Sequence, residues 1–160
     1  VELARDEGAA QEITEFDLVR VIERALARVR RRAHDVTFVT DLEPWFVRGV
    51  SAALERAVTN LLDNAVKWSP EGGTVTVSLA DGVLLVDDEG PGIDDADLPH
   101  VFNRFYRSEA SRSMPGSGLG LAIVQQAVGR HAGAVRADRA PSGGARLSMW
   151  LPGVGAGSRV

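Results

Sequence analysis

The stretch Asn60-Leu61-Leu62-Asp63-Asn64-Ala65-Val66-Lys67 lies inside a longer segment, residues 51–67, whose apolar side chains recur at spacings of three and four. This period predicts a helix with one buried face, and Ser51 is expected to cap it. Asn60, Asn64 and Lys67 line up along one edge of that face. Asparagine competes with the helix for backbone hydrogen bonds, so two of them one turn apart indicate a functional role. Solvated surface amides are the alternative.

An amide oxygen is a hard ligand that suits Mg²⁺, which binds few protein groups and keeps its waters and any substrate phosphates. On this interpretation Lys67 is a point charge that faces the phosphates. It is also the only lysine among the 18 basic residues, so any mechanism that needs a lysine has this one candidate.

Outward from this helix, alternation and turn signals predict the other elements. Asp17 is expected to cap the first helix, and Asp81-Gly82 is a hairpin signal. Strands are expected at residues 13–16, 36–42, 44–50, 74–79, 83–86, 134–138 and 146–151, helices at 18–33 and 119–131, and a short helical turn at 98–102.

The composition is that of one soluble domain, with 160 residues, 44% hydrophobic and 25% charged. No apolar stretch approaches the roughly 18 residues that a bilayer requires. The absence of cysteine excludes disulfides and thiolate metal sites, and the net charge of −4 argues against nucleic acid as a partner. Residues 1–12 are expected to be a linker from an upstream element, residues 13–152 the folded domain, and residues 153–160 a tail.

Three further motifs can carry chemistry. Asp88-Glu89-Gly90-Pro91-Gly92-Ile93 follows an apolar strand, so the carboxylate of Asp88 can accept a hydrogen bond from the exocyclic amine of a base; a surface turn is an equal alternative. Gly116-Ser117-Gly118-Leu119-Gly120-Leu121 opens a helix, whose free N–H groups can hold phosphates. Its spacing is neither a Rossmann fingerprint nor a Walker loop.

Two guanidinium groups for a terminal phosphate are supplied by the stretch Phe102-Asn103-Arg104-Phe105-Tyr106-Arg107. When this motif is taken alone, core aromatics with arginines at the rim are the favoured interpretation.

Taken together and in order, these stretches resemble the N, G1, F and G2 boxes of bacterial sensor histidine kinases. The resemblance extends over residues 12–152. It implies the Bergerat fold, an α+β two-layer sandwich in which a mixed, mostly antiparallel sheet packs against helices, as in gyrase, Hsp90 and MutL. It also implies that the chain binds ATP and Mg²⁺.

The resemblance assigns a role to each matching residue. Asn64 is the expected Mg²⁺ ligand, with Asn60 and Lys67 near the phosphates and Asp88 on the adenine amine. The remaining nucleotide contacts are expected from Trp68, Gly90, Gly92 and Ile93 on the adenine side, Arg104 and Arg107 at the terminal phosphate, and Gly116, Gly118, Leu119, Gly120 and Leu121 around the triphosphate. Gly143-Gly144 resembles a third glycine box, but Ala145 and Leu147 replace its usual residues, so no ligand is assigned to it.

The gyrase-like relatives carry a glutamate general base at the position of Asn60. Because an amide is not basic, the site is expected to orient ATP for transfer to a side chain elsewhere, with Asn60 and Arg107 as the catalytic residues. His34-Asp35 lacks the proline expected after an acceptor histidine, so the acceptor is expected in a dimerisation domain outside this sequence. If a base has been overlooked, Glu55 is the first candidate.

The resemblance also implies the setting. A cognate response regulator is the expected partner, and the full-length protein is expected to be a homodimer on the cytoplasmic side of the cell membrane, whereas this fragment alone would be a soluble monomer. An anti-sigma-type serine kinase and a nucleotide-gated interaction module of the same fold are the alternatives. The polar segment 108–118 is expected to be a mobile lid, because it has little apolar surface to bury.

Overall fold

The computed structural model describes residues 12–104, 106 and 120–154, which form one main sheet, a small strand pair and three α-helices. Their order along the chain is β1 (Thr14–Asp17), α2 (Leu18–Arg30), β2 (Thr37–Leu42), β3 (Phe46–Gly49), α3 (Ser51–Trp68), β4 (Thr74–Ala80), β5 (Val83–Asp87), the 3₁₀ helix η1 (Leu98–His100), α4 (Gly120–Arg130), β6 (Ala134–Arg139) and β7 (Ala145–Trp150).

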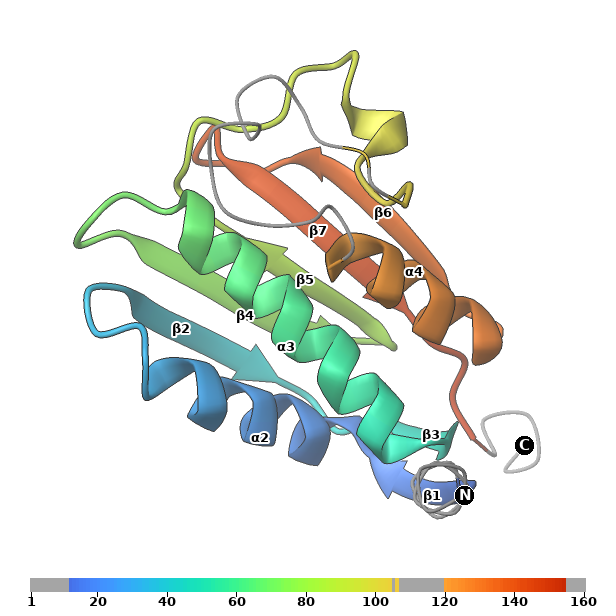
Figure 1. Cartoon of the computed structure of the whole chain (residues 1–160). Coiled ribbons are helices and arrows are strands. Elements are labelled where there is room, and N and C mark those ends of the chain that lie inside the picture. Colours follow the sequence, from blue (N-terminus) through green and yellow to red (C-terminus); the bar gives the residue numbers. More distant parts are fainter. Residues whose placement is uncertain (1–11, 105, 107–119, 155–160) are drawn as a thin grey trace, which may run out of the picture.

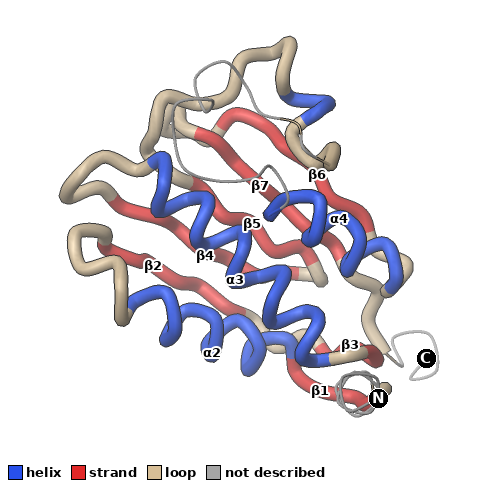
Figure 2. The backbone as a smooth tube through the Cα atoms, viewed as in Figure 1, coloured by secondary structure: helices blue, strands red, loops and turns tan. Residues whose placement is uncertain are grey.

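The main sheet has five strands in the order β2-β4-β5-β7-β6. β2 runs parallel to β4, and each other neighbouring pair is antiparallel. The three α-helices lie side by side on one face of this sheet (Figures 1 and 2), and β1 pairs with β3 in a separate two-stranded sheet. The expected α+β two-layer sandwich, with a mixed and mostly antiparallel sheet against helices, is therefore confirmed.

Alternation along the strands decides which face of the sheet is buried. In β4, Val75, Val77 and Leu79 are fully buried, whereas Thr76 and Ala80 on the other face are exposed. An antiparallel sheet can leave one face in water in this way. The apolar arc predicted for residues 51–67 is the core face of α3, with buried Leu54, Ala57, Val58, Leu61, Leu62 and Ala65.

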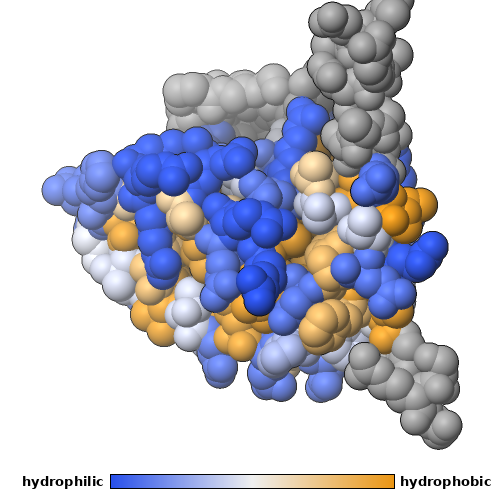
Figure 3. Space-filling view, turned by 90° about the horizontal axis from the view of Figure 1, so that it is seen from below, coloured by the Kyte–Doolittle hydropathy of each residue, from blue (hydrophilic) through white to orange (hydrophobic). Residues whose placement is uncertain are grey.

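On one face of the molecule, hydrophilic side chains predominate and smaller hydrophobic areas lie between them (Figure 3). Figure 3 shows this mixture on the face seen from below the view of Figure 1. Large apolar side chains that are exposed include Val39, Phe46 and Trp150. Among the described residues, no helix has both the length and the apolarity needed to span a bilayer.

Ion pairs fix α2 against one side of α3. The carboxylate of Glu55 accepts hydrogen bonds from Arg24 Nε at 2.8 Å and Arg28 Nη2 at 2.9 Å. About two helical turns further along α3, Arg32 Nη2 lies 2.6 Å from Asp63 Oδ2. Because the arginine side chains are about half exposed, each pair stabilises the fold only slightly. They nevertheless show that Glu55 and Asp63 face α2.

The ends of the helices test the capping predictions. Asp17 Oδ1 accepts the Val19 N–H at 3.1 Å, so Asp17 is the N-cap of α2 as predicted. The prediction for Ser51 is wrong: Val50 is the N-cap of α3, and its side chain makes no capping hydrogen bond. The helix predicted at 18–33 ends at Arg30, and the other elements differ from the predicted ones by a few residues at their ends.

A histidine that follows α4 accepts the backbone N–H of Val50, the residue at the start of α3. His131 lies just after α4, and its Nε2 accepts the Val50 N–H at 3.0 Å. Its Nδ1 lies 2.6 Å from the Ala127 carbonyl oxygen. Both contacts are satisfied by the neutral tautomer with the proton on Nδ1, which donates to Ala127. Sequence analysis missed this residue because its partner is distant in the chain.

Replacing His131 by alanine should lower the free energy of unfolding by about 1–3 kcal/mol, because the Val50 N–H loses its acceptor at the start of α3. Urea denaturation of the two proteins measures the difference. His34→Ala is the matched control, since His34 is exposed, and it should stay within about 0.5 kcal/mol of the parent. Equal losses in the two variants would contradict a stabilising contact between His131 and the Val50 N–H.

Candidate functional site

Close backbone contacts bring the predicted site residues together beyond the end of β5. A side chain at Gly90 would collide with the carbonyl oxygen of Trp68, so the segment after β5 packs directly on the end of α3. A Cβ at Gly92, where φ is +81°, would lie 2.7 Å from the Gly143 carbonyl oxygen. The same segment therefore also packs on the turn between β6 and β7. These close approaches explain why glycine occupies both positions.

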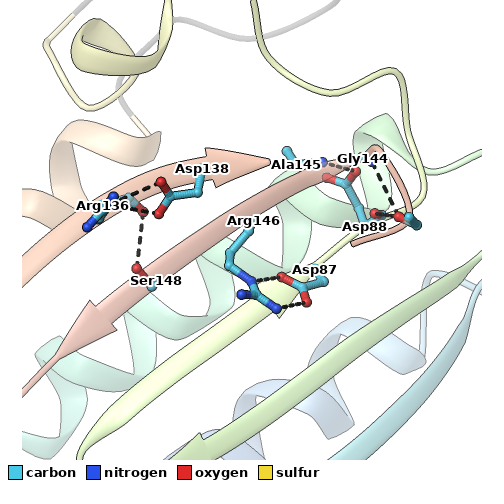
Figure 4. A network of polar contacts seen from close by, with 9 residues as sticks. Asp87, Asp88, Arg136, Asp138, Gly144, Ala145, Arg146 and Ser148 are labelled. Atoms are coloured by element: carbon cyan, nitrogen blue, oxygen red, sulfur yellow. Dashed lines mark hydrogen bonds and ion pairs between the residues drawn. The ribbon is translucent and has the colours of Figure 1, made fainter. Parts of the chain in front are cut away.

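Asp88 is the buried polar centre of this arrangement, with only 3% of its surface exposed. Its Oδ1 accepts two backbone hydrogen bonds, from Gly90 at 2.9 Å and from Ala145 at 3.0 Å. Figure 4 shows Ala145 beside the Asp88 carboxylate. No described residue donates to Oδ2. The carboxylate is therefore held by one oxygen, and the other oxygen can accept a further hydrogen bond.

The Ala145 N–H reaches this carboxylate because the β5–β7 ladder changes its pattern here. Asp87 is paired with Arg146, so Asp88 and Ala145 would form the next pair. The Asp88 N–H still donates to the Ala145 carbonyl at 3.0 Å. The reciprocal Ala145 N–H, however, is taken by the side chain of Asp88 rather than by its carbonyl. One backbone donor of β7 is thus diverted to the Asp88 carboxylate.

The β6–β7 turn completes the support of Asp88. Ser142 Oγ donates to the Asp88 carbonyl at 3.1 Å and accepts the Gly144 N–H at 3.3 Å. A side chain at Gly144 would collide with the Asp88 carbonyl oxygen. Sequence analysis assigned no role to this turn, although the paired glycines directly before a strand were a signal of close backbone approach.

The electrostatic environment of Asp88 is set mainly by its burial. Burial raises the pKa of Asp88 above the ordinary range of aspartate, because the charged form loses hydration. The N–H groups of Ala145 and Gly90 oppose this rise, and the neighbouring charge of Asp87 adds to it. A carboxylate in this position is suited to recognising a hydrogen-bond donor.

The polar edge of α3 faces α4. Asn60 Nδ2 donates to the carbonyl of Gly120, the first residue of α4, at 3.2 Å. Asn64 and Lys67 follow on α3 and are partly exposed. Lys67 Nζ lies 5.7 Å from the centre of the Trp68 ring. The structure thus connects the asparagine edge with the N-terminus of α4 and, through Trp68, with the segment after β5.

Glu55, the candidate for an overlooked base, lies on another side of α3. Both of its carboxylate oxygens are engaged by arginines of α2, whereas Asn60 is bonded to α4. A base must come within hydrogen-bond reach of the proton it removes. The structure therefore places Glu55 in the packing of α2 against α3.

The structure places only part of the last two boxes. Phe102 is buried in the core and Arg104 is exposed. Ile93 and Leu121 are partly buried against the core. Tyr106 donates to Asp97 Oδ1. The predictions for Arg107, Gly116, Gly118 and Leu119, and for the lid at 108–118, lie outside the described residues.

With this geometry in place, the comparison with known families is decisive. Residues 49–154 match the family described as histidine kinase-, DNA gyrase B-, and HSP90-like ATPase. This range includes α3, Asp88 and the β6–β7 turn. The chain belongs to this ATPase family. The family that the four boxes predicted is therefore confirmed.

Relatives within the family include signal transduction histidine-protein kinase/phosphatase MprB. The MprB of Mycobacterium sp. (strain KMS) is 49% identical over 162 residues, which cover 96% of this chain and 32% of that protein. The MprB of Mycolicibacterium smegmatis is also 49% identical, over 33% of its length. The chain thus spans about a third of the length of these curated relatives.

Solved structures agree with this assignment. A mycobacterial sensor histidine kinase MprB structure superimposes with a TM-score of 0.82 at 48% identity, covering 88% of this chain and 98% of that chain. The ATP-binding domain of PrrB from Mycobacterium tuberculosis gives a TM-score of 0.67 at 29% identity, covering 88% of this chain and 97% of that chain.

Gly144→Ala should displace the β6–β7 turn, because the added methyl group would occupy the space of the Asp88 carbonyl. We expect a loss of about 1–3 kcal/mol in unfolding free energy, the range for overpacking. Gly129→Ala is the matched control, since a Cβ there meets nothing within 4 Å and glycine in a helix should be replaceable at a gain of about 0.5–1 kcal/mol. Thermal unfolding with the opposite order of stability would contradict this role of Gly144.

Proposed function

We propose that this chain is the ATP-binding, phosphotransferring domain of a sensor histidine kinase, which presents the terminal phosphate of Mg-ATP to a histidine outside this sequence. The observation that carries the proposal is the buried Asp88 carboxylate, fixed through Oδ1 by two backbone amides and with Oδ2 not used by any described residue. Membership of the family and the named relatives support the same conclusion.

Adenine recognition follows from the hydrogen-bonding chemistry of Asp88. Oδ2 would accept a hydrogen bond from the exocyclic amine of adenine, whereas guanine presents a carbonyl oxygen at that position. A carbonyl facing a carboxylate leaves both acceptors unpaired, which is costly in a buried site. Gly90 and Gly92 let the segment after β5 pack closely on α3 and on the β6–β7 turn beside Asp88, and we assign this segment to the adenine side. Trp68 offers apolar surface at the end of α3.

The phosphate end is assigned to α3 and the start of α4. Asn64 would contribute an amide oxygen to Mg²⁺, which supplies charge neutralisation of the phosphates when it is bound. Asn60 and Lys67 lie on the same edge of α3 and would orient the phosphates. Gly120 opens α4, whose N-terminal N–H groups are suited to an anion. We also assign phosphate contacts to Arg104, Arg107, Gly116, Gly118, Leu119 and Leu121.

The transfer step needs an acceptor that this chain holds in line but does not contain. Asn60 cannot remove a proton from water, and Glu55 is engaged by arginines. We therefore assign Asn60 and Arg107 to orienting and charge stabilisation, and propose an acceptor histidine in the dimerisation domain that precedes this chain in the whole protein. The response regulator, the homodimeric state and the location beside the membrane belong to that whole protein and are proposed with it.

The relatives' names favour histidine as the acceptor over the alternatives. MprB is named a histidine-protein kinase/phosphatase, whereas an anti-sigma-type serine kinase would transfer to a serine and an interaction module would not transfer at all. A phosphotransfer assay with the missing domain supplied in trans separates the three, because phosphohistidine is lost in acid and phosphoserine is not.

Asp88→Asn should weaken ATP binding by about 10- to 150-fold, since a charge-assisted hydrogen bond contributes about 1.5–3 kcal/mol. Calorimetry with ATP and GTP measures this, and the parent protein should prefer ATP. Because the pKa of Asp88 is raised, ATP affinity should also fall as the pH drops through that raised pKa and Oδ2 becomes protonated. Equal affinity of the parent for ATP and GTP would rule out the role of Asp88.

Asn64→Ala should abolish the increase in ATP affinity that Mg²⁺ produces, because the amide oxygen is the proposed metal contact. Titration with ATP in the presence of Mg²⁺ and in the presence of a chelator gives the two affinities. Asn60→Ala is the comparison on the same helix edge, and it should weaken binding while keeping the metal dependence. Full metal dependence in Asn64→Ala would disprove the metal assignment.

The isolated chain should bind ATP but neither phosphorylate itself nor hydrolyse ATP appreciably. Holding an acceptor in line can supply about 7–11 kcal/mol that free water does not receive. Adding the cognate dimerisation domain should restore transfer, and Arg107→Ala should then reduce transfer more than binding. Sustained ATP hydrolysis by the repurified chain would contradict the assignment of Asn60.

A further inference from the structure

We propose that Arg146 and Asp87, on the open face of the sheet, are a positioning pair for adenine recognition, because they hold β5 and β7 in the register that lets Ala145 fix Asp88. Neither residue is among those assigned to nucleotide contacts. The inference rests on the proposed function, since it assigns the support of the residue that is proposed to bind adenine.

The pair has the geometry of a strong ion pair. Arg146 Nε donates to Asp87 Oδ1 and Arg146 Nη2 donates to Asp87 Oδ2, both at 2.8 Å (Figure 4). The side chains are 30% and 16% exposed, so both are largely shielded from water. A bidentate contact between partly buried groups resists screening better than an exposed pair. It therefore joins β5 to β7 firmly at this point.

Its position in the sheet makes this contact important for the site. Asp87 and Arg146 are the last paired residues of β5 and β7. At the next position the Ala145 N–H donates to the Asp88 side chain instead of to the Asp88 carbonyl. Beyond them, one backbone hydrogen bond between Asp88 and Ala145 remains. A strand end that has lost a ladder bond opens more easily. The ion pair directly before it compensates for that loss.

The pair also controls the charge beside Asp88. The Asp87 carboxylate raises the pKa of Asp88, and Arg146 neutralises that carboxylate from the neighbouring strand. Of the other charged groups nearby, Asp138 on β6 faces Arg146, and Glu89 accepts the Thr74 N–H. Without the guanidinium, the two adjacent carboxylates would repel each other, and the pKa of Asp88 would rise further.

Arg146→Met is the test variant, and Arg136→Met is its matched control. Arg136 lies on the same face of the neighbouring strand β6 and pairs with Asp138, with no contact to Asp87 or Asp88. The same substitution there removes an ion pair from the same face of the sheet and leaves Arg146, Asp87 and the contact between them in place, with Asp138 still facing Arg146. Thermal unfolding of both variants shows that they are folded before binding is measured.

Calorimetry compares ATP with inosine triphosphate, in which a carbonyl replaces the 6-amino group. Arg146→Met should bind ATP about tenfold more weakly while its affinity for the inosine nucleotide changes little. Arg136→Met should bind both nucleotides as the parent does. The exchanged pair Asp87→Arg/Arg146→Asp should recover most of the preference for ATP. Unchanged ATP affinity in Arg146→Met, or an equal loss for both nucleotides, would overturn the proposal.

Measurements without nucleotide keep this inference separate from the proposed function. In Arg146→Met the Asp88 carboxyl should titrate at a higher pH by NMR, and the Ala145 amide should exchange about tenfold faster, with neither change in Arg136→Met. If the parent does not distinguish the two nucleotides but these changes occur, the adenine assignment fails and the positioning of Asp88 stands. If neither change occurs, the positioning pair is wrong whatever the nucleotide binding shows.

Discussion

The buried carboxylate of Asp88 is the constraint on which the rest of the site depends. A charge that is almost fully removed from water must be compensated by donors, and here the backbone supplies them from Gly90 and Ala145. This requirement explains the diverted ladder of β7 and the absence of a side chain at Gly144. Gly90, Gly144 and Ala145 are separated in the sequence, and in the structure all three allow the buried carboxylate of Asp88 to be held by backbone N–H groups.

Helix α3 separates stability from function on its different sides. Its apolar arc fills the core, and Asn60 bonds to α4. Its acidic side chains Glu55 and Asp63 pair with arginines in α2 and just after its end. The ion pairs hold both carboxylates on one side of α3, and an amide lies on the side of α4. The division fits a domain that is proposed to hold ATP intact until an acceptor arrives.

The chain shares its fold and its family with larger proteins. The matched family includes histidine kinases, gyrase B and HSP90, and the chain spans about a third of the curated MprB relatives. We propose that the sandwich holds the nucleotide and that the chemistry depends on what is brought to it. We propose that the remainder of the whole protein brings the acceptor and the signal.

The sequence by itself determined the elements and the family, because hydrophobic period, turn residues and ordered motifs are local properties of the chain. The helix at 51–67, the Asp81-Gly82 hairpin and the four boxes needed no long-range information. Only the tertiary structure decided which groups support them. Ala145 reaches Asp88 across 57 positions and His131 reaches Val50 across 81. Donors and acceptors so distant in sequence become partners only when strands and helices pack, so no local pattern could have revealed them.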